Sequence, residues 1–427
     1  MEKRYYPQVD ETLYRETLPC GLEIAVLPRP GFTKKLCYLV TDFGAIHTEF
    51  TIDGKACRVP GGVAHYLEHK LFDMPGRDIT EEFSTLGAVP NAFTGYDMTA
   101  YYFSCAENFY DNLKLLLEFV TTGYFTPESV QKEQGIIGQE ILMNEDSPDN
   151  VLFEMLVRAM YENHPIRVPI LGTQDSIAQI TPQVLQSCHR AFYRPDNLLL
   201  CAIGDIDPDT VSNLARQAME NLPCPSVTAV KSWEEPMTVK TPFVTRSMEV
   251  SMPMFQLGFK CEPLPNGKTG VEQEIVGDLA AEALFGESSP LYLRLYEQGL
   301  IDASFGGGFE TIEGMALLTA SGDSEDPETV RDAILQEAAR LAETGIPEAD
   351  FLRMKRSALG RRIRGLDSFE STCFRICAYH FSKFDYFQIP DAYRQVQRRQ
   401  VQEFLQRVVT QPRMCMAVLT PKEEESL

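Results

Sequence analysis

The sequence predicts an α+β protein made of two related α/β domains, each a mainly antiparallel sheet packed by helices. Short apolar runs of strand length alternate with longer segments of helical periodicity along the 427 residues. The second half of the chain also repeats the plan of the first. We expect one domain at residues 1–225 and a degenerate copy at 241–427. A linker rich in Pro, Ser and Thr, at 226–240, would join them.

The elements of the first half follow from its apolar periodicity. A helix is expected to begin after Gly61-Gly62 and to run through His69, and a short helix follows at 80–86. Further helices should dominate between the last hairpin strand and Tyr193. The apolar run at 198–203 predicts a strand buried on both faces. The expected strands are residues 23–27, 37–43, 90–94, 99–105 and 198–203, of which 90–94 and 99–105 form a hairpin across Gly95.

The internal repeat also locates the chemistry. Asn91-Ala-Phe-Thr-Gly-Tyr with the strand after it resembles Ala303-Ser-Phe-Gly-Gly-Gly with residues 315–321, and Thr126-Pro-Glu and Gly138-Gln-Glu-Ile parallel Ile346-Pro-Glu and Gly360-Arg-Arg-Ile. The second copy has no histidine between His189 and His380, and Arg362 stands at the position of Glu140. Only the first domain is therefore expected to bind a metal.

Composition excludes several classes of partner. The net charge of -22 disfavours nucleic acids and anionic membranes, which bind through clustered Lys and Arg. A neutral or cationic peptide is a better match, although an acidic surplus is also typical of a protein that is simply kept soluble.

Features of the termini and cysteines predict a cytoplasmic protein. Residues 1–10 carry charges and tyrosines in place of the apolar core of a secretory signal, and no apolar stretch reaches the roughly 20 residues of a membrane span. The eleven cysteines form no Cys-x-x-Cys pair, which favours reduced and mostly buried thiols. Cys373 and Cys377 are expected to be neighbours on a helix face.

The sequence His65-Tyr-Leu-Glu68-His69 is an H-x-x-E-H motif. Residues four apart share one face of a helix, so His65 and His69 can bind one ion while Glu68 points to the same side. Zinc accepts neutral nitrogen ligands with a carboxylate as the third and keeps a fourth position open for water. Chance gives this motif in about one in a hundred sequences with six histidines. The pattern predicts a zinc site in which Glu68 is free to act as a general base.

A third ligand is expected on a later helix. The stretch Glu133-Gln-Gly-Ile-Ile-Gly-Gln-Glu140 places two glutamates seven residues apart, two turns from each other on one helix face. Either glutamate could supply a metal ligand or a hydrogen bond to a ligand histidine. Glutamates on helices are also often only solvated.

These residues resemble the insulinase/pitrilysin family of zinc metallopeptidases, the inverzincins. The resemblance is to the short-subunit branch that includes mitochondrial processing peptidase, and it is closest to the bacterial YmfH-like members. It spans nearly the whole chain. It rests on His65-x-x-Glu68-His69, Glu133 to Glu140, Asn91-Ala-Phe-Thr, His164-Pro with Gly172-Thr, and Phe192-Tyr-Arg-Pro-Asp-Asn-Leu leading to Gly204-Asp205.

The resemblance implies a role for each residue of the motif. His65, His69 and Glu140 would bind one Zn²⁺ per chain, Glu68 would be the catalytic base, and Glu133 would support the ligands without binding the metal. Asn91 and Ala92 would pair with the backbone of a peptide substrate. The interval from His69 to Glu140 is a few residues shorter than is usual in the family, and the loop and hairpin between residues 73 and 99 can absorb the difference.

One part of the family's site is missing. Relatives stabilise the oxyanion with an Arg and a Tyr in a stretch resembling Arg-Glu-Lys-x-Gly-Leu-Ala-Tyr, which matches Leu295-Tyr-Glu-Gln-Gly-Leu-Ile-Asp302 in this sequence. Leu295 and Asp302 replace the pair, and loss of such donors typically lowers the rate about a hundredfold. A sibling subunit supplying the Arg and Tyr is therefore expected. Arg294, one residue out of register, is the alternative source.

The sequence therefore predicts a zinc endopeptidase or the catalytic subunit of a two-chain peptidase. A non-catalytic scaffold subunit that keeps zinc for structure is the alternative. Glu68 favours catalysis, since structural zinc sites normally have four protein ligands and need no base. The ligands alone are also compatible with hydrolysis of a non-peptide bond.

Overall fold

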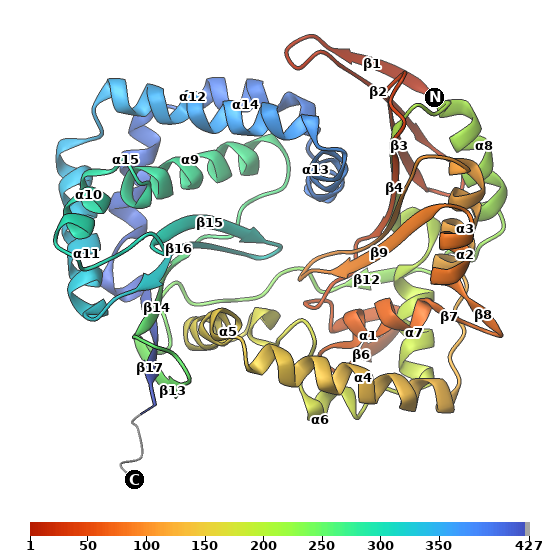
Figure 1. The fold of residues 1–427 in the computed structure, drawn as a ribbon, viewed down its shortest axis with the longest axis horizontal. Coiled ribbons are helices and arrows are strands. Elements are labelled where there is room, and N and C mark those ends of the chain that lie inside the picture. Colours follow the sequence, from red (N-terminus) through yellow and green to blue (C-terminus); the bar gives the residue numbers. More distant parts are fainter. Residues whose placement is uncertain (423–427) are drawn as a thin grey trace. The chain divides into compact units, whose positions relative to one another are not determined.

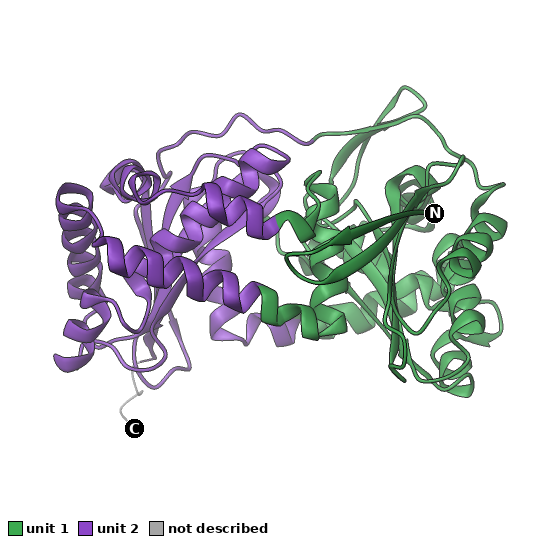
Figure 2. Ribbon diagram, turned by 90° about the horizontal axis from the view of Figure 1, so that it is seen from above, with its two compact units in different colours: residues 1–141, 168–230, 363–388 green, residues 142–167, 231–362, 389–427 purple. Residues whose placement is uncertain are grey.

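The computed structural model describes residues 1–422, which form two compact units (Figures 1 and 2). Unit 1 comprises residues 1–141, 168–230 and 363–388, and unit 2 comprises residues 142–167, 231–362 and the described chain from 389 onward. Each unit is a sheet packed by helices. The predicted α+β fold with two related domains is confirmed.

Unit 1 is built on a seven-stranded sheet in the order β1-β2-β3-β11-β4-β10-β9. Only β3 and β11 pair in parallel, and all other neighbours are antiparallel. β11 is buried at every position, as the apolar run predicts. The strands are β1 (Glu2–Tyr6), β2 (Glu11–Thr17), β3 (Glu23–Pro28), β4 (Lys35–Thr41), β9 (Ala88–Thr94), β10 (Thr99–Cys105) and β11 (Leu198–Gly204).

The helices of unit 1 other than α13 enclose its main core against one face of this sheet, and α13 packs on the other face. Val26, Leu39 and Phe103 of the sheet pack with Tyr66 and Leu116 of the helices, and all five are at most 1% exposed. Burial of such apolar surface is the dominant favourable contribution to folding. The helices are α1 (Val63–Leu71), α2 (Ile79–Thr85), α3 (Phe109–Thr121), α4 (Pro127–Glu145), α6 (Gln174–Ile177), α7 (Pro182–Phe192), α8 (Pro208–Met219) and α13 (Phe369–Phe381).

Several short strands of unit 1 were not predicted. β1 and β2 extend the sheet at its N-terminal edge, and β4 begins two residues earlier than the predicted 37–43. Two small sheets lie apart from the main one. Their strands are β5 (Glu49–Ile52), β6 (Lys55–Arg58) and β12 (Val227–Ala229) in one, and β7 (Asp73–Met74) and β8 (Arg77–Asp78) in the other.

Unit 2 repeats the central topology of unit 1. Its sheet has the order β13-β17-β14-β16-β15, with β13 and β17 parallel and the rest antiparallel, which matches β3-β11-β4-β10-β9 strand for strand. The strands are β13 (Phe243–Met248), β14 (Met254–Cys261), β15 (Gly306–Ile312), β16 (Met315–Asp323) and β17 (Met414–Pro421), and the helices are α5 (Pro148–Met160), α9 (Lys268–Phe285), α10 (Pro290–Glu297), α11 (Pro327–Thr344), α12 (Glu348–Arg364), α14 (Ile389–Gln395) and α15 (Arg398–Val408).

One detail of the predicted repeat is out of register. Asn91 to Thr94 end β9, whereas Ala303 to Phe305 precede β15. The strands after them, β10 and β16, do correspond. The loops of the two hairpins differ in length, at residues 95–98 and 313–314, so a match of short motifs could not fix the alignment of the first hairpin strand.

The compact units depart from the linear division at 225 and 241 in two segments. Residues 142–167 belong to unit 2, because α5 packs on β13, β14 and β17. Residues 363–388 belong to unit 1, because α13 packs on β4 and β11. Figure 2 shows both segments in the colours of their units. Periodicity identifies the apolar face of a helix, but it does not reveal which sheet that face covers.

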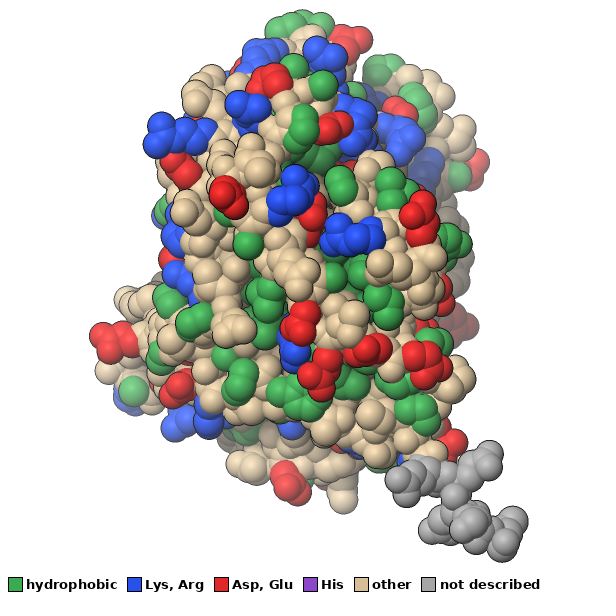
Figure 3. Space-filling view, turned by 90° about the vertical axis from the view of Figure 1, so that its left-hand side faces the viewer, with side chains coloured by type: hydrophobic (Ala, Val, Ile, Leu, Met, Phe, Trp, Pro, Cys, Tyr) green, Lys and Arg blue, Asp and Glu red, His purple; other side chains and the backbone are tan. Residues whose placement is uncertain are grey.

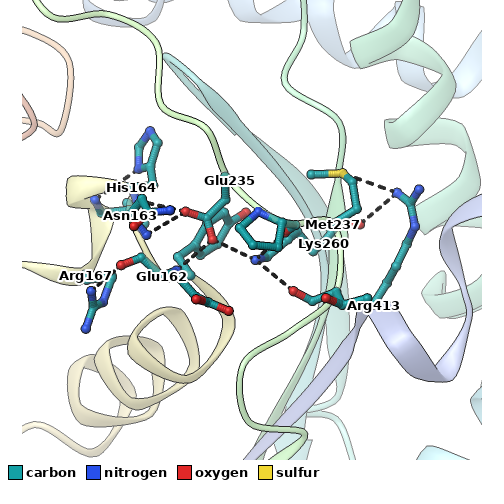
Figure 4. Close-up of polar contacts among 12 residues, drawn as sticks. Glu162, Asn163, His164, Arg167, Glu235, Met237, Lys260 and Arg413 are labelled. Carbon is teal, nitrogen blue, oxygen red and sulfur yellow. Dashed lines mark hydrogen bonds and ion pairs between the residues drawn. The ribbon is translucent and has the colours of Figure 1, made fainter.

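The expected linker is packed against its neighbours. β12 pairs with β5 in unit 1, and the chain from residue 231 belongs to unit 2. There the Glu235 carboxylate accepts the backbone N–H groups of Glu162 and Asn163 at 2.7 Å and the Lys260 ammonium at 2.9 Å (Figure 4). The side chains of Glu235 and Lys260 are 4% and 0% exposed, so each neutralises a charge that would be costly to bury alone.

His164, part of the His-Pro motif, has a structural role in this network. Its Nε2–H donates to the Glu313 carbonyl at 2.9 Å, and its Nδ1 accepts the Ile166 N–H at 3.1 Å. The ring packs against Trp233, the only tryptophan of the chain. Burial lowers the pKa of His164 and keeps the ring neutral.

The cysteines and helices agree with two further expectations. All eleven cysteines are free thiols and most are buried, and Cys373 and Cys377 both lie on the buried face of α13. Within residues 1–422, no helix combines the length and the apolar character needed to cross a bilayer.

Candidate metal centre

The first helix of the site begins where only glycine fits. Gly62, the residue before α1, has a φ of 88°, in the left-handed region that disfavours side chains. A Cβ at this position would also meet the Leu171 carbonyl oxygen at 2.4 Å. The chain can therefore turn sharply into α1, which carries His65, Glu68 and His69.

Two hydrogen bonds hold the neighbouring helix α4 in place. Tyr66, which follows His65 in the sequence, is fully buried, and its hydroxyl donates to the Val130 carbonyl on α4. Gln174 Nε2 donates to the Gly138 carbonyl at 2.7 Å, two residues before Glu140. The first contact joins α4 to α1, and the second joins it to α6.

His65, His69 and Glu140 come together at this junction. The Nε2 atoms of His65 and His69 each lie 3.5 Å from an oxygen of the Glu140 carboxylate. One ligand atom from each of the three residues lies within 4.8 Å of the others. Ligand atoms of a tetrahedral zinc, each about 2.1 Å from the ion, lie about 3.4 Å apart. The donor set and its spacing fit zinc.

Glu133 orients the second histidine. The Nδ1–H of His69 donates to Glu133 Oε1 at 3.0 Å, which leaves Nε2 as the nitrogen facing Glu140. Burial lowers the pKa of His69, but the hydrogen bond to Glu133 and the charges of Glu133, Glu68 and Glu140 outweigh it and raise that pKa above its ordinary value. The hydrogen bond with His65 holds the pKa of Glu140 below its ordinary value. The carboxylates of Glu68, Glu133 and Glu140 therefore concentrate negative charge around His69, which favours a cation.

His65 lies deeper than His69. Its side chain is 8% exposed, against 27% for His69. Its Nδ1 is buried and has no hydrogen-bond partner among the described residues. Nε2 is the ring nitrogen that faces Glu140.

Glu68 is a buried carboxylate beside the ligand set. It is 8% exposed, and Thr94 on β9 donates its hydroxyl to Glu68 Oε2 at 2.6 Å. Burial raises the pKa of Glu68 above its ordinary value, although the Thr94 hydrogen bond and the nearby histidines oppose the rise. Oε1 accepts no hydrogen bond from the residues that the structure describes. A carboxylate with a raised pKa is a better proton acceptor than an ordinary glutamate.

The predicted substrate-binding residues lie on the last strand of the sheet. β9 pairs with β10 only, so its other edge has unpaired backbone groups. Asn91 is exposed and Ala92 is half-buried. Asn91 Oδ1 accepts the Ala92 N–H at 2.8 Å, and Pro90 has no N–H to offer. Neither Pro90 nor Ala92 therefore offers a free N–H to a further strand.

The positions expected for the oxyanion donors lie in unit 2. Leu295 is buried on α10 and Asp302 is exposed after it. Arg294, the alternative donor, has Nη1 3.7 Å from Glu337 Oε2. Arg340 donates to both oxygens of the same Glu337 carboxylate, at 3.1 and 2.6 Å.

Sequence reasoning did not assign three residues that position the site. Thr94 was part of a quoted motif, but its contact with Glu68 depends on the pairing of β9. Tyr66 and Gln174 form hydrogen bonds to backbone carbonyls of α4, and no residue pattern predicts such hydrogen bonds. The H-x-x-E-H spacing was the available signal for Tyr66, since it places residue 66 on the flank of α1 beside the face that carries His65 and His69.

The fold and site define a class of protein. Residues 59–174 match the model of the insulinase family, peptidase family M16, and residues 179–358 match the M16 inactive domain. The chain belongs to the M16 insulinase family. It is 35% identical over 422 residues to YmfH of Bacillus subtilis, named an uncharacterized zinc protease, and the match covers 98% of each chain.

Two solved structures show the same architecture. An M16-like peptidase from Alicyclobacillus acidocaldarius has a TM-score of 0.91 at 28% identity, covering 96% of this chain and 98% of that one. Pitrilysin has a TM-score of 0.77 at 16% identity, and the match covers 98% of this chain but 46% of pitrilysin. At that identity pitrilysin shows the fold alone.

Proposed function

We propose that this protein is a zinc-dependent endopeptidase, or the catalytic subunit of a two-chain peptidase, that hydrolyses peptides or small unfolded proteins. The supporting observation is the convergence of His65 Nε2 and His69 Nε2 on the Glu140 carboxylate, each at 3.5 Å, with the buried Glu68 beside them. We assign His65, His69 and Glu140 as the ligands of one Zn²⁺. Relatives named zinc proteases support the choice of metal.

A zinc ion bound here would supply Lewis acidity for activating water and polarising a peptide carbonyl. Glu68 accepts the proton of the attacking water and returns it to the leaving amine. Thr94 holds Oε2 of Glu68, so Oε1 is the oxygen that carries the proton. Glu133 fixes the tautomer of His69 with the proton on Nδ1, so Nε2 stays available to the metal.

The unpaired edge of β9 binds the substrate backbone in this proposal. An extended peptide would add to Ala92 and Thr94 by strand pairing, so recognition depends mainly on the main chain and extends to unfolded sequences. The Asn91 side chain must release the Ala92 N–H when the substrate binds. The negative net charge favours neutral and cationic peptides.

A sibling subunit completes the oxyanion site in this proposal, because Leu295 and Asp302 cannot donate the hydrogen bonds that the family's Arg and Tyr provide. The non-catalytic scaffold is the alternative, and the same absence favours it. The intact Glu68 favours catalysis, since a scaffold has no use for a base.

The Glu68→Gln variant tests the proposed function. Gln keeps the shape of Glu68 and its contact with Thr94 but cannot accept a proton. We expect zinc content to be unchanged and cleavage of an unstructured fluorogenic peptide to fall by a factor of about 10² to 10⁴. Cleavage that persists in Glu68→Gln would show that Glu68 is not the base, whereas zinc-loaded protein that never cleaves a peptide, with or without a sibling, would support the scaffold instead.

A second experiment separates the sources of the oxyanion donors. Sibling M16 chains from the same host that carry the Arg and Tyr but lack H-x-x-E-H are added to the purified protein. We expect a gain of about a hundredfold in cleavage, with no change on Arg294→Ala in the complex. Strong cleavage by the isolated chain that Arg294→Ala abolishes would instead assign the donor to Arg294.

A further inference from the structure

Unit 2 contains a cavity that shares no residue with the metal centre. It has a volume of about 640 Å³. Its walls come from the end of α9, the start of α10, the end of α11 and the starts of α12 and α15. The volume is within the range typical of small-molecule sites.

The floor of this cavity is apolar. Ala283, Leu341, Ile346 and Met354 contribute to it and are between 3% and 7% exposed. These side chains belong to the core of the unit, and the cavity gives a ligand access to them from the surface. An apolar group that covered them would be removed from water, which favours binding.

The rim of the cavity is cationic in a chain with 39 basic and 61 acidic residues. Arg340, Arg353 and Arg398 line it, and their side chains are 46%, 52% and 46% exposed. Figure 3 shows Lys and Arg side chains gathered mainly in the upper half of the face of the molecule on which α10 and α11 lie. A cationic rim over an apolar floor matches an amphiphilic anion.

Two of these arginines retain free donors. Arg353 donates Nη1 to Ser288 Oγ at 3.1 Å and lies 3.7 Å from Asp350, which is beyond hydrogen-bond distance. Arg398 donates Nη1 to the Ile346 carbonyl at 3.1 Å and lies 3.3 Å from Glu348 through Nε. A guanidinium has five N–H donors, so both can bind a further oxyanion. Arg340 is already committed to Glu337 and contributes charge only.

The charged side chains of the lining indicate how many negative charges a bound anion would carry. The lining holds three arginines and two carboxylates, Asp350 and Glu282, which sum to a net charge of +1. The partners outside the lining offset one another in part, because Arg361 pairs with Glu282 while Glu337 and Glu348 pair with Arg340 and Arg398. This balance suits a single negative charge better than the double charge of a phosphate ester.

We propose that this cavity binds a small organic monoanion, a carboxylate with an apolar body. The carboxylate lies between Arg353 and Arg398, and the apolar body covers Leu341 and Met354. The site needs neither zinc nor substrate, so its occupancy is separate from the proposed peptidase activity.

Isothermal titration calorimetry on the full chain tests the proposal with three probes. Octanoate has both features, octan-1-ol lacks the charge, and inorganic phosphate lacks the apolar body. We expect octanoate to bind at least tenfold more tightly than either of the others. Each of three results would overturn the proposal. Octanol that binds as tightly as octanoate would show an apolar site without selectivity for charge, and phosphate that binds as tightly would show a cationic patch without an apolar part. The third result is no binding of octanoate.

Substitutions locate the binding. Arg353→Met and Arg398→Met should each weaken octanoate binding by about tenfold, the usual loss for one charge-assisted hydrogen bond. Arg356→Met is the matched control, because Arg356 is exposed on α12 but does not line the cavity. Ser288→Trp keeps both arginines and blocks the rim, so it should abolish binding. Octanoate affinity that is unchanged in Ser288→Trp, or equally reduced in Arg356→Met, would place the anion elsewhere and overturn the proposal.

Discussion

The guanidinium of Arg362 lies 3.0 Å from the carboxylate of Asp278 and occupies in unit 2 the repeat position that Glu140 holds in unit 1. It also lies 2.9 Å from Glu274, and Glu274 and Asp278 are four residues apart on α9, as His65 and His69 are on α1. The second copy has therefore exchanged the signs of its charges. In unit 2 the guanidinium of Arg362 on α12 holds the two carboxylates of α9. At the same position, unit 1 is suited to bind a metal cation.

Arg362→Met should destabilise the protein. The side chains of Arg362, Glu274 and Asp278 are 13%, 18% and 28% exposed, so the substitution leaves two mostly buried carboxylates without their cation. We expect a loss of about 2–3 kcal/mol, below the range for a fully buried pair because some solvent reaches the acids. Urea unfolding monitored by circular dichroism measures it. Arg364→Met, at an exposed position of the same helix, is the control and should change stability by less than about 0.5 kcal/mol.

Metal content should follow the three proposed ligands. The His65→Ala/His69→Ala double variant should contain almost no zinc, because both nitrogen donors are lost. Glu140→Gln should lower zinc occupancy in dilute chelator and keep the fold, since the glutamate is 43% exposed. Elemental analysis after dialysis decides the matter. A full equivalent of zinc in the double variant would show that the metal lies elsewhere.

Glu133→Gln should weaken zinc binding without removing a ligand. The carboxylate accepts the Nδ1–H of His69 at 3.0 Å and strengthens Nε2 as a donor, and loss of such a partner typically lowers metal affinity about 10- to 100-fold. Competition with a fluorescent zinc chelator gives the dissociation constant. Glu128→Gln, in the first turn of the same helix, should leave it unchanged.

Thr94→Val should move the acidic limb of the pH–rate profile. The Thr94 hydroxyl stabilises the ionised form of Glu68, so its removal raises the pKa of Glu68 further above the ordinary value. A base with a higher pKa is protonated at a higher pH, so activity should begin to fall at a higher pH than in the parent. Thr94→Ser keeps the hydroxyl and should retain the parental profile. A shift toward lower pH in Thr94→Val would contradict this account of Glu68.

Zinc binding should weaken as the pH falls. Both histidines must be neutral to bind the metal, and the pKa of metal-free His69 is raised by its acidic neighbours. Protons therefore compete with zinc at a higher pH than they would for an ordinary histidine. We expect affinity and peptide cleavage to decline together as the pH falls, with the decline beginning above the ordinary histidine pKa of about 6.5. Activity that persists after zinc is lost would indicate a mechanism without metal.

The sequence predicted the residues of the candidate site better than the residues that position them. His65, Glu68 and His69 follow from helical spacing, and Glu140 from a second helix plus the family resemblance. Thr94 and Gln174 could not be predicted, because their contacts depend on strand pairing and loop packing between distant segments. The short edge strands were missed for a similar reason. β1 is exposed at four of its five positions, so it has little apolar alternation to reveal it.

The placement of α13 on the sheet of unit 1 has a consequence for how the protein is made. During synthesis, β4 and β11 emerge long before residues 369–381, so the buried face carrying Tyr38 and Cys201 stays uncovered until the ribosome has almost finished. A fragment ending near residue 225 should therefore expose an apolar surface and aggregate. Each compact unit draws segments from both halves of the chain, so a single cut cannot separate unit 1 from unit 2.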